Sequence, residues 1–144
     1  MLPPFNERGD LPPGIHQATW TEMEARLSRG FVRQSLFRTL RHLHVLALRA
    51  GHLERFLVFG SFVTDKEAPG DLDAVLVMAE SFRLEEAPRE PRVLFSHADA
   101  DTRFAASVFW VRRGILPESE IGGFLDFWQT RRDGGKRGIV EVIA

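Results

Sequence analysis

The stretch FLVFGSFVTDKEAPGDLDAVLVM, residues Phe56–Met78, decides the fold of this chain. It begins with an apolar run, Phe56–Phe59, and ends with a second one, Leu72–Met78. Short apolar runs bounded by Gly, Pro and Asp are typical of buried strands. Gly60 and Ser61 follow the first run as a turn, and a polar connection leads to the second. We therefore predict two buried strands that the rest of the chain covers.

Apolar periodicity predicts the elements around these two strands. The clearest is a helix over Ser28–Ala50, in which apolar residues recur every three or four positions and after which Gly51 favours termination. The strand before the turn extends back to Leu53. The other predicted elements are a short helix that Thr19 or Thr21 caps, a short helix or a strand with a turn over Arg92–Asp101, strands over Phe104–Val111 and Gly138–Ile143, and a helix over Ser119–Thr130. Together they predict an α+β (or α/β) fold, with a mixed sheet of about 3–5 strands flanked by helices.

Length and composition predict one domain, residues 1–144, whose first 18 residues form an extended arm. Residues 1–16 hold four prolines and two glycines, which exclude a helix there. The net charge of −1 gives no reason to expect nucleic-acid binding, and the lack of cysteine excludes disulfides and thiolate metal sites. The sequence has neither a signal-peptide pattern nor an apolar run of about 20 residues. We therefore expect a cytoplasmic protein without a membrane span.

The candidate chemistry lies at the mouth of the second strand. Asp71 and Asp73 are two residues apart, so in a strand both carboxylates point to one face, about 6–7 Å from each other. Two parallel acids repel unless a positive charge compensates them, and carboxylate oxygens suit Mg²⁺ or Mn²⁺. The Gly60-Ser61 turn could hold a phosphate beside such a cation. The simpler alternative is a strand–turn–strand unit with solvent-facing acids.

Other charged and aromatic residues have two interpretations each. Lys66 could reach a triphosphate from the loop between the site elements, or be solvated. His16 in the arm is a weaker site candidate. Five arginines of the long helix could form a solvated face or a basic rim beside a phosphate cleft: Arg29, Arg33, Arg38, Arg41 and Arg49. Three aromatic residues favour a core or dimer-surface role over base stacking: Phe124, Phe127 and Trp128.

The spacing of Gly60-Ser61 and Asp71-Leu72-Asp73 resembles the signature of the nucleotidyltransferase superfold, the fold of polymerase-beta-like enzymes and minimal nucleotidyltransferases. Three wider segments are similar to a family of small bacterial nucleotidyltransferase-like proteins of uncharacterised function: LPPGIH (11–16), GSFVTDKEAPGDLDAVLV (60–77) and FWQTRRDGGKRGIVEV (127–142). The resemblance covers nearly the whole chain.

The resemblance implies roles for individual residues. Gly60 and Ser61 would bind nucleotide phosphates, and Asp71 and Asp73 would hold the metal and act in catalysis. A third carboxylate is expected on the following strand, but the matching position there is Ser107. Two acids that precede this strand could substitute from a loop: Asp99 and Asp101.

Two functions are therefore open. One is a Mg-dependent nucleotidyltransferase that moves a nucleoside monophosphate from a nucleoside triphosphate (NTP) to a protein or nucleic-acid hydroxyl. The other is a catalytically degenerate binding or regulatory protein, for example one component of a toxin–antitoxin pair. The resemblance implies NTP as ligand and favours a protein partner, and the aromatic set is also compatible with a homo-oligomer.

Overall fold

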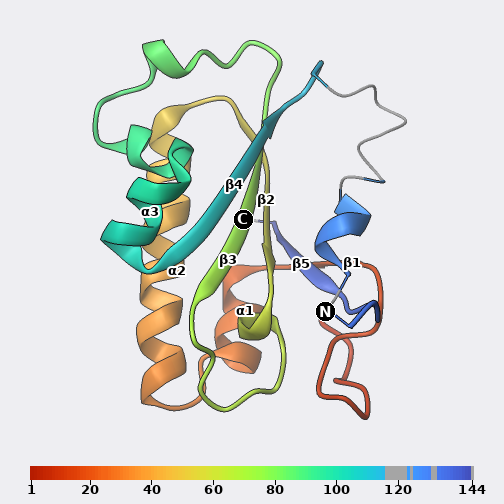
Figure 1. The fold of residues 1–144 in the computed structure, drawn as a ribbon. Coiled ribbons are helices and arrows are strands. Elements are labelled where there is room, and N and C mark those ends of the chain that lie inside the picture. The colour runs from red at the N-terminus through yellow and green to blue at the C-terminus, as the bar shows by residue number, and fades with distance from the viewer. Residues whose placement is uncertain (116–122, 124, 131–132, 144) are drawn as a thin grey trace.

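The computed structural model describes residues 1–115, 123, 125–130 and 133–143, and its main feature is a mixed β-sheet (Figure 1). In this part of the chain the sheet has five strands in the order β1-β5-β2-β3-β4. The central pair, β2 and β3, is antiparallel, as is β2 with β5, whereas β1 with β5 and β3 with β4 are parallel. The strands are β1 (Ile15–Ala18), β2 (Leu53–Phe59), β3 (Leu72–Met78), β4 (Ala106–Arg112) and β5 (Ile139–Val142). The predicted α+β class with a mixed sheet is confirmed.

Helices cover both faces of the sheet. The helices α1 (Trp20–Leu27), α2 (Phe31–Ala50) and α3 (His97–Phe104) contribute to the larger core on one face. Helical residues 125–128 lie on the other face, where Leu125 packs in a smaller core with residues of β2, β3 and β5. In Figure 1 α2 runs along the sheet, and the C-terminal helical residues lie apart from it. The sheet is therefore the middle layer of the molecule.

The two faces of β3 follow the alternation that the sequence predicts. Val75 and Val77 belong to the smaller core, on the side that also carries Asp73. The alternate residues lie in the larger core beneath α2: Leu72, Ala74, Leu76 and Met78. Every residue of the strand is buried except Asp73, which is partly buried. An acid at this point therefore lies at the open end of an otherwise apolar strand.

Most predicted boundaries shift by a few residues. The long helix begins at Phe31 rather than Ser28, because Gly30 is its N-cap. The strand predicted over Phe104–Val111 begins at Ala106, because α3 extends to Phe104 and ends where Ala105 adopts a left-handed conformation. The ambiguous Arg92–Asp101 stretch is helical: a 3₁₀ helix over Pro91–Phe95 precedes α3. Residues 125–128 of the predicted C-terminal helix are helical, whereas 119–122 and 124 lie outside the described residues.

The N-terminal segment is more than an extended arm. Its residues Ile15–Ala18 form the edge strand β1, paired in parallel with β5. Leu2 and Leu11 are buried in the larger core, so the segment before β1 is anchored as well. Thr19 then caps α1 by accepting a hydrogen bond from the Glu22 amide at 3.2 Å. Among the residues that the structure describes, no helix is long and apolar enough to cross a membrane.

Candidate functional site

The Gly60 turn and Asp73 form one compact unit. Gly60 follows β2 with φ +79° and ψ −163°, a backbone conformation that is essentially restricted to glycine. The antiparallel register places Phe59 opposite Asp73, so the carboxylate lies directly against the turn. A Cβ atom on Gly60 would overlap Asp73 Oδ2. Only glycine therefore allows both this turn and this position of the carboxylate.

The two acids of the D-x-D pair have different surroundings. Asp73 is the second residue of β3 and is partly buried, whereas Asp71 precedes the strand and is exposed. The prediction that both belong to the strand is therefore wrong by one residue at its start. Ser61, on the other side of the turn, begins a short 3₁₀ helix, Ser61–Val63. The turn and both acids lie together at the end of β2 and the start of β3.

Ser107, the residue that the resemblance matches to the third carboxylate, lies beside Asp73. In the parallel β3–β4 register Ser107 is the partner of Asp73, and both side chains are partly buried. Asp99 and Asp101 are exposed residues of α3, so the expectation that they lie in a loop is wrong. Among the described residues, no three His, Cys, Asp or Glu side chains form a group that could hold a metal ion. A serine hydroxyl, rather than a third carboxylate, accompanies Asp73 on the neighbouring strand.

The acid pair still suits a divalent cation. Mg²⁺ commonly binds one or two carboxylates and completes its shell with water and substrate phosphates. Asp73 supplies such oxygens directly beside the Gly60-Ser61 turn, because its carboxylate fills the space that a Gly60 side chain would take, and the exposed Asp71 supplies a second carboxylate two residues earlier. This donor set fits a cation that arrives with a phosphate ligand. It does not amount to a closed protein cage.

Comparison with known proteins places the chain in a family but gives it no activity. A family model described as a family of unknown function, DUF6932, matches residues 3–143. The chain belongs to this family. No curated protein and no solved structure matches the chain.

Arg33 is the functional candidate whose position the sequence analysis missed. It is 5% exposed rather than on a solvated face or a basic rim. Its guanidinium donates hydrogen bonds to four backbone carbonyls, those of Leu27, Phe62, Thr64 and Lys66. Burial lowers the pKa of Arg33 below its ordinary value, although the negative charge of the nearby Asp65 opposes this effect. The guanidinium nevertheless stays charged, as it does in proteins generally.

A signal for this burial was present in the sequence. Arg33 precedes Phe37 by four residues and Leu40 by seven, and both are core residues of α2. Residues at these spacings share one helix face. Arg33 therefore occupies the apolar stripe of α2, and only its charge suggested a place on the surface.

Lys66 contributes to this arrangement through its backbone. Its carbonyl accepts bonds from Arg33 Nε at 2.9 Å and Nη2 at 2.6 Å, and its amide donates to Thr64 Oγ1 at 3.2 Å. The Lys66 residue is exposed in the loop between the turn and β3. Its predicted phosphate contact stays a prediction.

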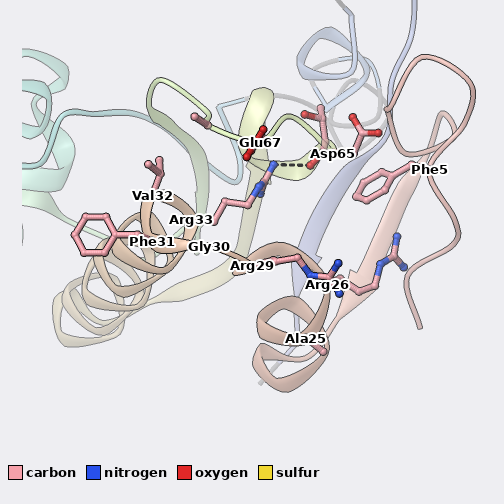
Figure 2. A pocket seen from close by; sticks show the side chains of 12 residues that line it. Phe5, Ala25, Arg26, Arg29, Gly30, Phe31, Val32, Arg33, Asp65 and Glu67 are labelled. Carbon is pink, nitrogen blue, oxygen red and sulfur yellow. Dashed lines mark hydrogen bonds between the residues drawn. The ribbon is translucent and has the colours of Figure 1, made fainter.

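The other arginines of the predicted Ser28–Ala50 helix do not form one basic rim. Arg29 lines a cavity of about 720 Å³ between the α1–α2 connection and the 64–68 loop (Figure 2). That cavity carries both signs of charge, because Asp65 and Glu67 line it too, and it includes neither Gly60 nor Asp73. Arg41 stacks over Trp20, 4.8 Å from the ring centroid, and Arg49 pairs with Glu90 at 3.2 Å.

His16 has a structural role in the arm. Its Nε2 lies 2.7 Å from the Pro12 carbonyl, and its ring packs against Gly138. A Cβ atom on Gly138 would overlap the Pro12 carbonyl and approach the His16 ring to 2.8 Å. The LPPGIH segment thus packs against the start of β5. His16 belongs to the edge strand β1, which β5 and β2 separate from the strand that carries Asp73.

The aromatic residues near the C-terminus divide into core and surface. Trp128 packs against Phe59 and Phe109, with ring centroids 4.6 and 4.5 Å apart, on the sheet face that carries Asp73. Phe127 is 66% exposed, and Phe124 lies outside the described residues. The expected core role fits Trp128 and does not fit Phe127.

Proposed function

We propose that this protein binds a nucleoside triphosphate together with Mg²⁺ or Mn²⁺ at the Gly60-Ser61 turn and the Asp71/Asp73 pair, and that it does not transfer the nucleotide. The observation that carries the proposal is the contact between the Asp73 carboxylate and Gly60. A cation on Asp73 is then close to a phosphate on the turn. When bound, the cation offsets the negative charges of the carboxylates and phosphate oxygens.

Each residue of the site has a separate task in this proposal. Gly60 leaves room for the Asp73 carboxylate beside the turn, and Ser61 offers its hydroxyl to a phosphate oxygen. Asp73 holds the cation from a fixed strand position, while the exposed Asp71 completes the pair from the residue before the strand. The affinity should therefore depend on both the nucleotide and the cation.

Ser107 favours binding over turnover. Transfer to a hydroxyl acceptor needs a base near the metal, and a carboxylate performs this task well at neutral pH. The residue that pairs with Asp73 on β4 is a serine, whose hydroxyl has no comparable basicity. The nucleotide would thus be held without an efficient way to activate an acceptor.

The resemblance to the nucleotidyltransferase superfold supports the nucleotide as ligand. It concerns the spacing of the turn and the acid pair, and the β2–β3–β4 arrangement is compatible with it. A binding protein of this type would act through a protein partner, as a regulator or a toxin–antitoxin component. That partner role rests on the resemblance alone.

Nucleotidyl transfer is the second candidate. The observation in its favour is that the Gly60 turn and the acid pair are both present, with Asp73 against the turn. A protein without nucleotide chemistry has no evident need for this arrangement. Under this alternative, one of the α3 acids or an acid of the acceptor would supply the missing base. Both candidates require the same metal–nucleotide complex.

Incubation with labelled NTPs separates the two. The protein is mixed with Mg²⁺ and each α-phosphate-labelled NTP, alone and with cell lysate, alongside the Asp71→Asn/Asp73→Asn variant. We expect label that the native protein retains in an EDTA-reversible way and no covalently labelled acceptor. Covalent label that requires both acids would establish the transferase instead. Neither retention nor transfer by the native protein would contradict both.

A further inference from the structure

We propose that Arg33 is the positioning residue of the Gly60-Ser61 turn: by binding the carbonyls that follow the turn, its guanidinium holds Ser61 ready to receive a phosphate. This inference rests on the nucleotide site proposed above. It assigns a role in ligand binding to a buried residue of α2 that does not itself belong to the turn or the acid pair.

The hydrogen bonds of Arg33 converge on the chain just after Ser61. Nη1 donates to the Phe62 carbonyl at 2.8 Å, and Nη2 to the Thr64 carbonyl at 2.6 Å. Nε and Nη2 both donate to the Lys66 carbonyl, at 2.9 and 2.6 Å. One side chain therefore fixes three carbonyls within five residues, from the short 3₁₀ helix into the loop that follows it. Figure 2 shows Arg33 reaching from α2 toward the loop that carries Asp65 and Glu67.

Arg33 also connects the turn to the helical layer. Its Nη1 donates to the Leu27 carbonyl at 3.0 Å, at the end of α1. The guanidinium lies 5.3 Å from the centroid of the Phe62 ring, which is fully buried. The residues after Ser61 are thus joined to α1 and α2 through a single buried cation.

The N-terminal arm holds the same loop from its other side. The Asp65 amide donates to the Gly9 carbonyl at 2.9 Å, and Asp10 forms a β-bridge with Thr64. The Asp65 carboxylate lies so close to Gly9 that a Cβ there would overlap it. The loop is therefore held by the buried Arg33 on one side and by the N-terminal arm on the other, and this restricts movement of the adjoining turn. Such preorganisation reduces the entropy that phosphate binding would otherwise cost.

Burying this charge is expensive, and the bonds explain why it is tolerated. All the hydrogen bonds that the structure describes for Arg33 go to backbone carbonyls, and Asp65 acts on it through its charge. A buried cation without a bonded carboxylate is stable only when its donors are well satisfied. An apolar side chain would fill the same stripe of α2 without this cost. The charge is hydrogen-bonded to the carbonyl of Phe62, the residue that follows Ser61 in the chain.

Two substitutions separate the geometry from the charge. Arg33→Lys keeps the charge but replaces the planar fork by a single ammonium, which cannot reach all the carbonyls. Arg33→Met keeps an unbranched apolar side chain and removes both the charge and the hydrogen-bond donors. Arg38 lies on the exposed side of the same helix, so Arg38→Lys and Arg38→Met are matched controls.

The test measures binding and local order in folded protein. The probes are inorganic tripolyphosphate and the four NTPs, each with Mg²⁺, and amide hydrogen exchange is followed over residues 61–66. We expect Arg33→Lys to weaken tripolyphosphate binding about tenfold, equivalent to about 1.4 kcal/mol, and to speed exchange in 61–66. The Arg38 variants should match the native protein in both measurements.

The alternatives give different results. If folded Arg33→Lys is less stable but binds the probes with native affinity, Arg33 is only structural and the inference is overturned. If the native protein binds none of the probes, the proposed function itself fails. Should neither Arg33 variant fold, exchange in the native protein decides. Slow exchange of the Val63 and Thr64 amides before any ligand is added supports preorganisation, and exchange that slows only with ligand contradicts it.

Discussion

At Gly60 the absence of a side chain decides where a carboxylate can lie. The turn needs a positive φ, and the space that a Cβ would occupy is taken by Asp73 Oδ2. Backbone conformation and acid position are therefore coupled at this residue. The same backbone region recurs at Gly51, with φ +77° and ψ 164°, where no atom lies within 4 Å of the Cβ position.

This pair of glycines gives a matched substitution. Gly51→Ala should cost about 1–3 kcal/mol of unfolding free energy from backbone strain alone. Gly60→Ala should cost more, because Asp73 must also move, and it should abolish Mg-dependent nucleotide binding. Urea denaturation and a binding titration of both variants check this. Equal stability losses, or native binding by Gly60→Ala, would show that the Asp73 contact is unimportant.

His44 predicts a pH dependence of stability. Burial, and then the positive charge of Arg41, lower the pKa of His44 from the ordinary 6.5, and its ring packs against those of Trp20 and Phe56. The unfolded chain therefore binds a proton at higher pH than the folded protein does. Stability should be full above pH 6.5 and decline as the pH falls from 6.5 toward the lower pKa of the folded state.

Denaturation at a series of pH values tests the role of His44. His44→Phe keeps an aromatic ring and should remove the decline just below pH 6.5. His42→Phe, on the exposed side of α2, should retain it because His44 is intact. A decline that persists unchanged in His44→Phe would assign it to another group.

At the scale of elements, an ion pair joins β2 to β5. Arg55 donates two hydrogen bonds of 2.8 Å to the Glu141 carboxylate, which is largely buried. The Arg55 hydrogen bond lowers the pKa of Glu141 below 4.5, against the effect of burial. The contribution of the pair is fully present above pH 4.5 and is lost as the pH falls through the lower pKa of the folded protein.

Removing one partner of this pair should be costly. Glu141→Gln leaves the Arg55 charge without its anion, and we expect a loss of about 2 kcal/mol at neutral pH. Glu54→Gln breaks the more exposed Arg113–Glu54 pair and should cost at most about 1 kcal/mol. Thermal denaturation of both variants measures the difference. Similar losses would mean that the β2–β5 pair adds nothing beyond a surface contact.

At the scale of the whole molecule, sequence patterns predicted what depends on local periodicity. β2, β3 and the two faces of β3 follow from runs of apolar residues. Such features need only the alternation of side chains along a strand. The position of Ser107 was expected from the resemblance instead, and the β3–β4 register pairs it with Asp73.

Features that depend on distant contacts were not predicted. β1 is too short and polar to be recognised alone, and it exists because β5, more than 120 residues later, pairs with it. The burial of Arg33 requires the carbonyls of a loop about 30 residues away. In both cases tertiary hydrogen bonds override what the local sequence favours.

Calorimetric titration of the native protein with each NTP, in Mg²⁺ and again in EDTA, is the direct test of metal-dependent nucleotide binding, with Asp71→Asn/Asp73→Asn as the comparison. We expect saturable binding of at least one NTP in Mg²⁺, strongly weakened in EDTA and lost in the double variant. No binding by the native protein, or equal binding by the double variant, would contradict it.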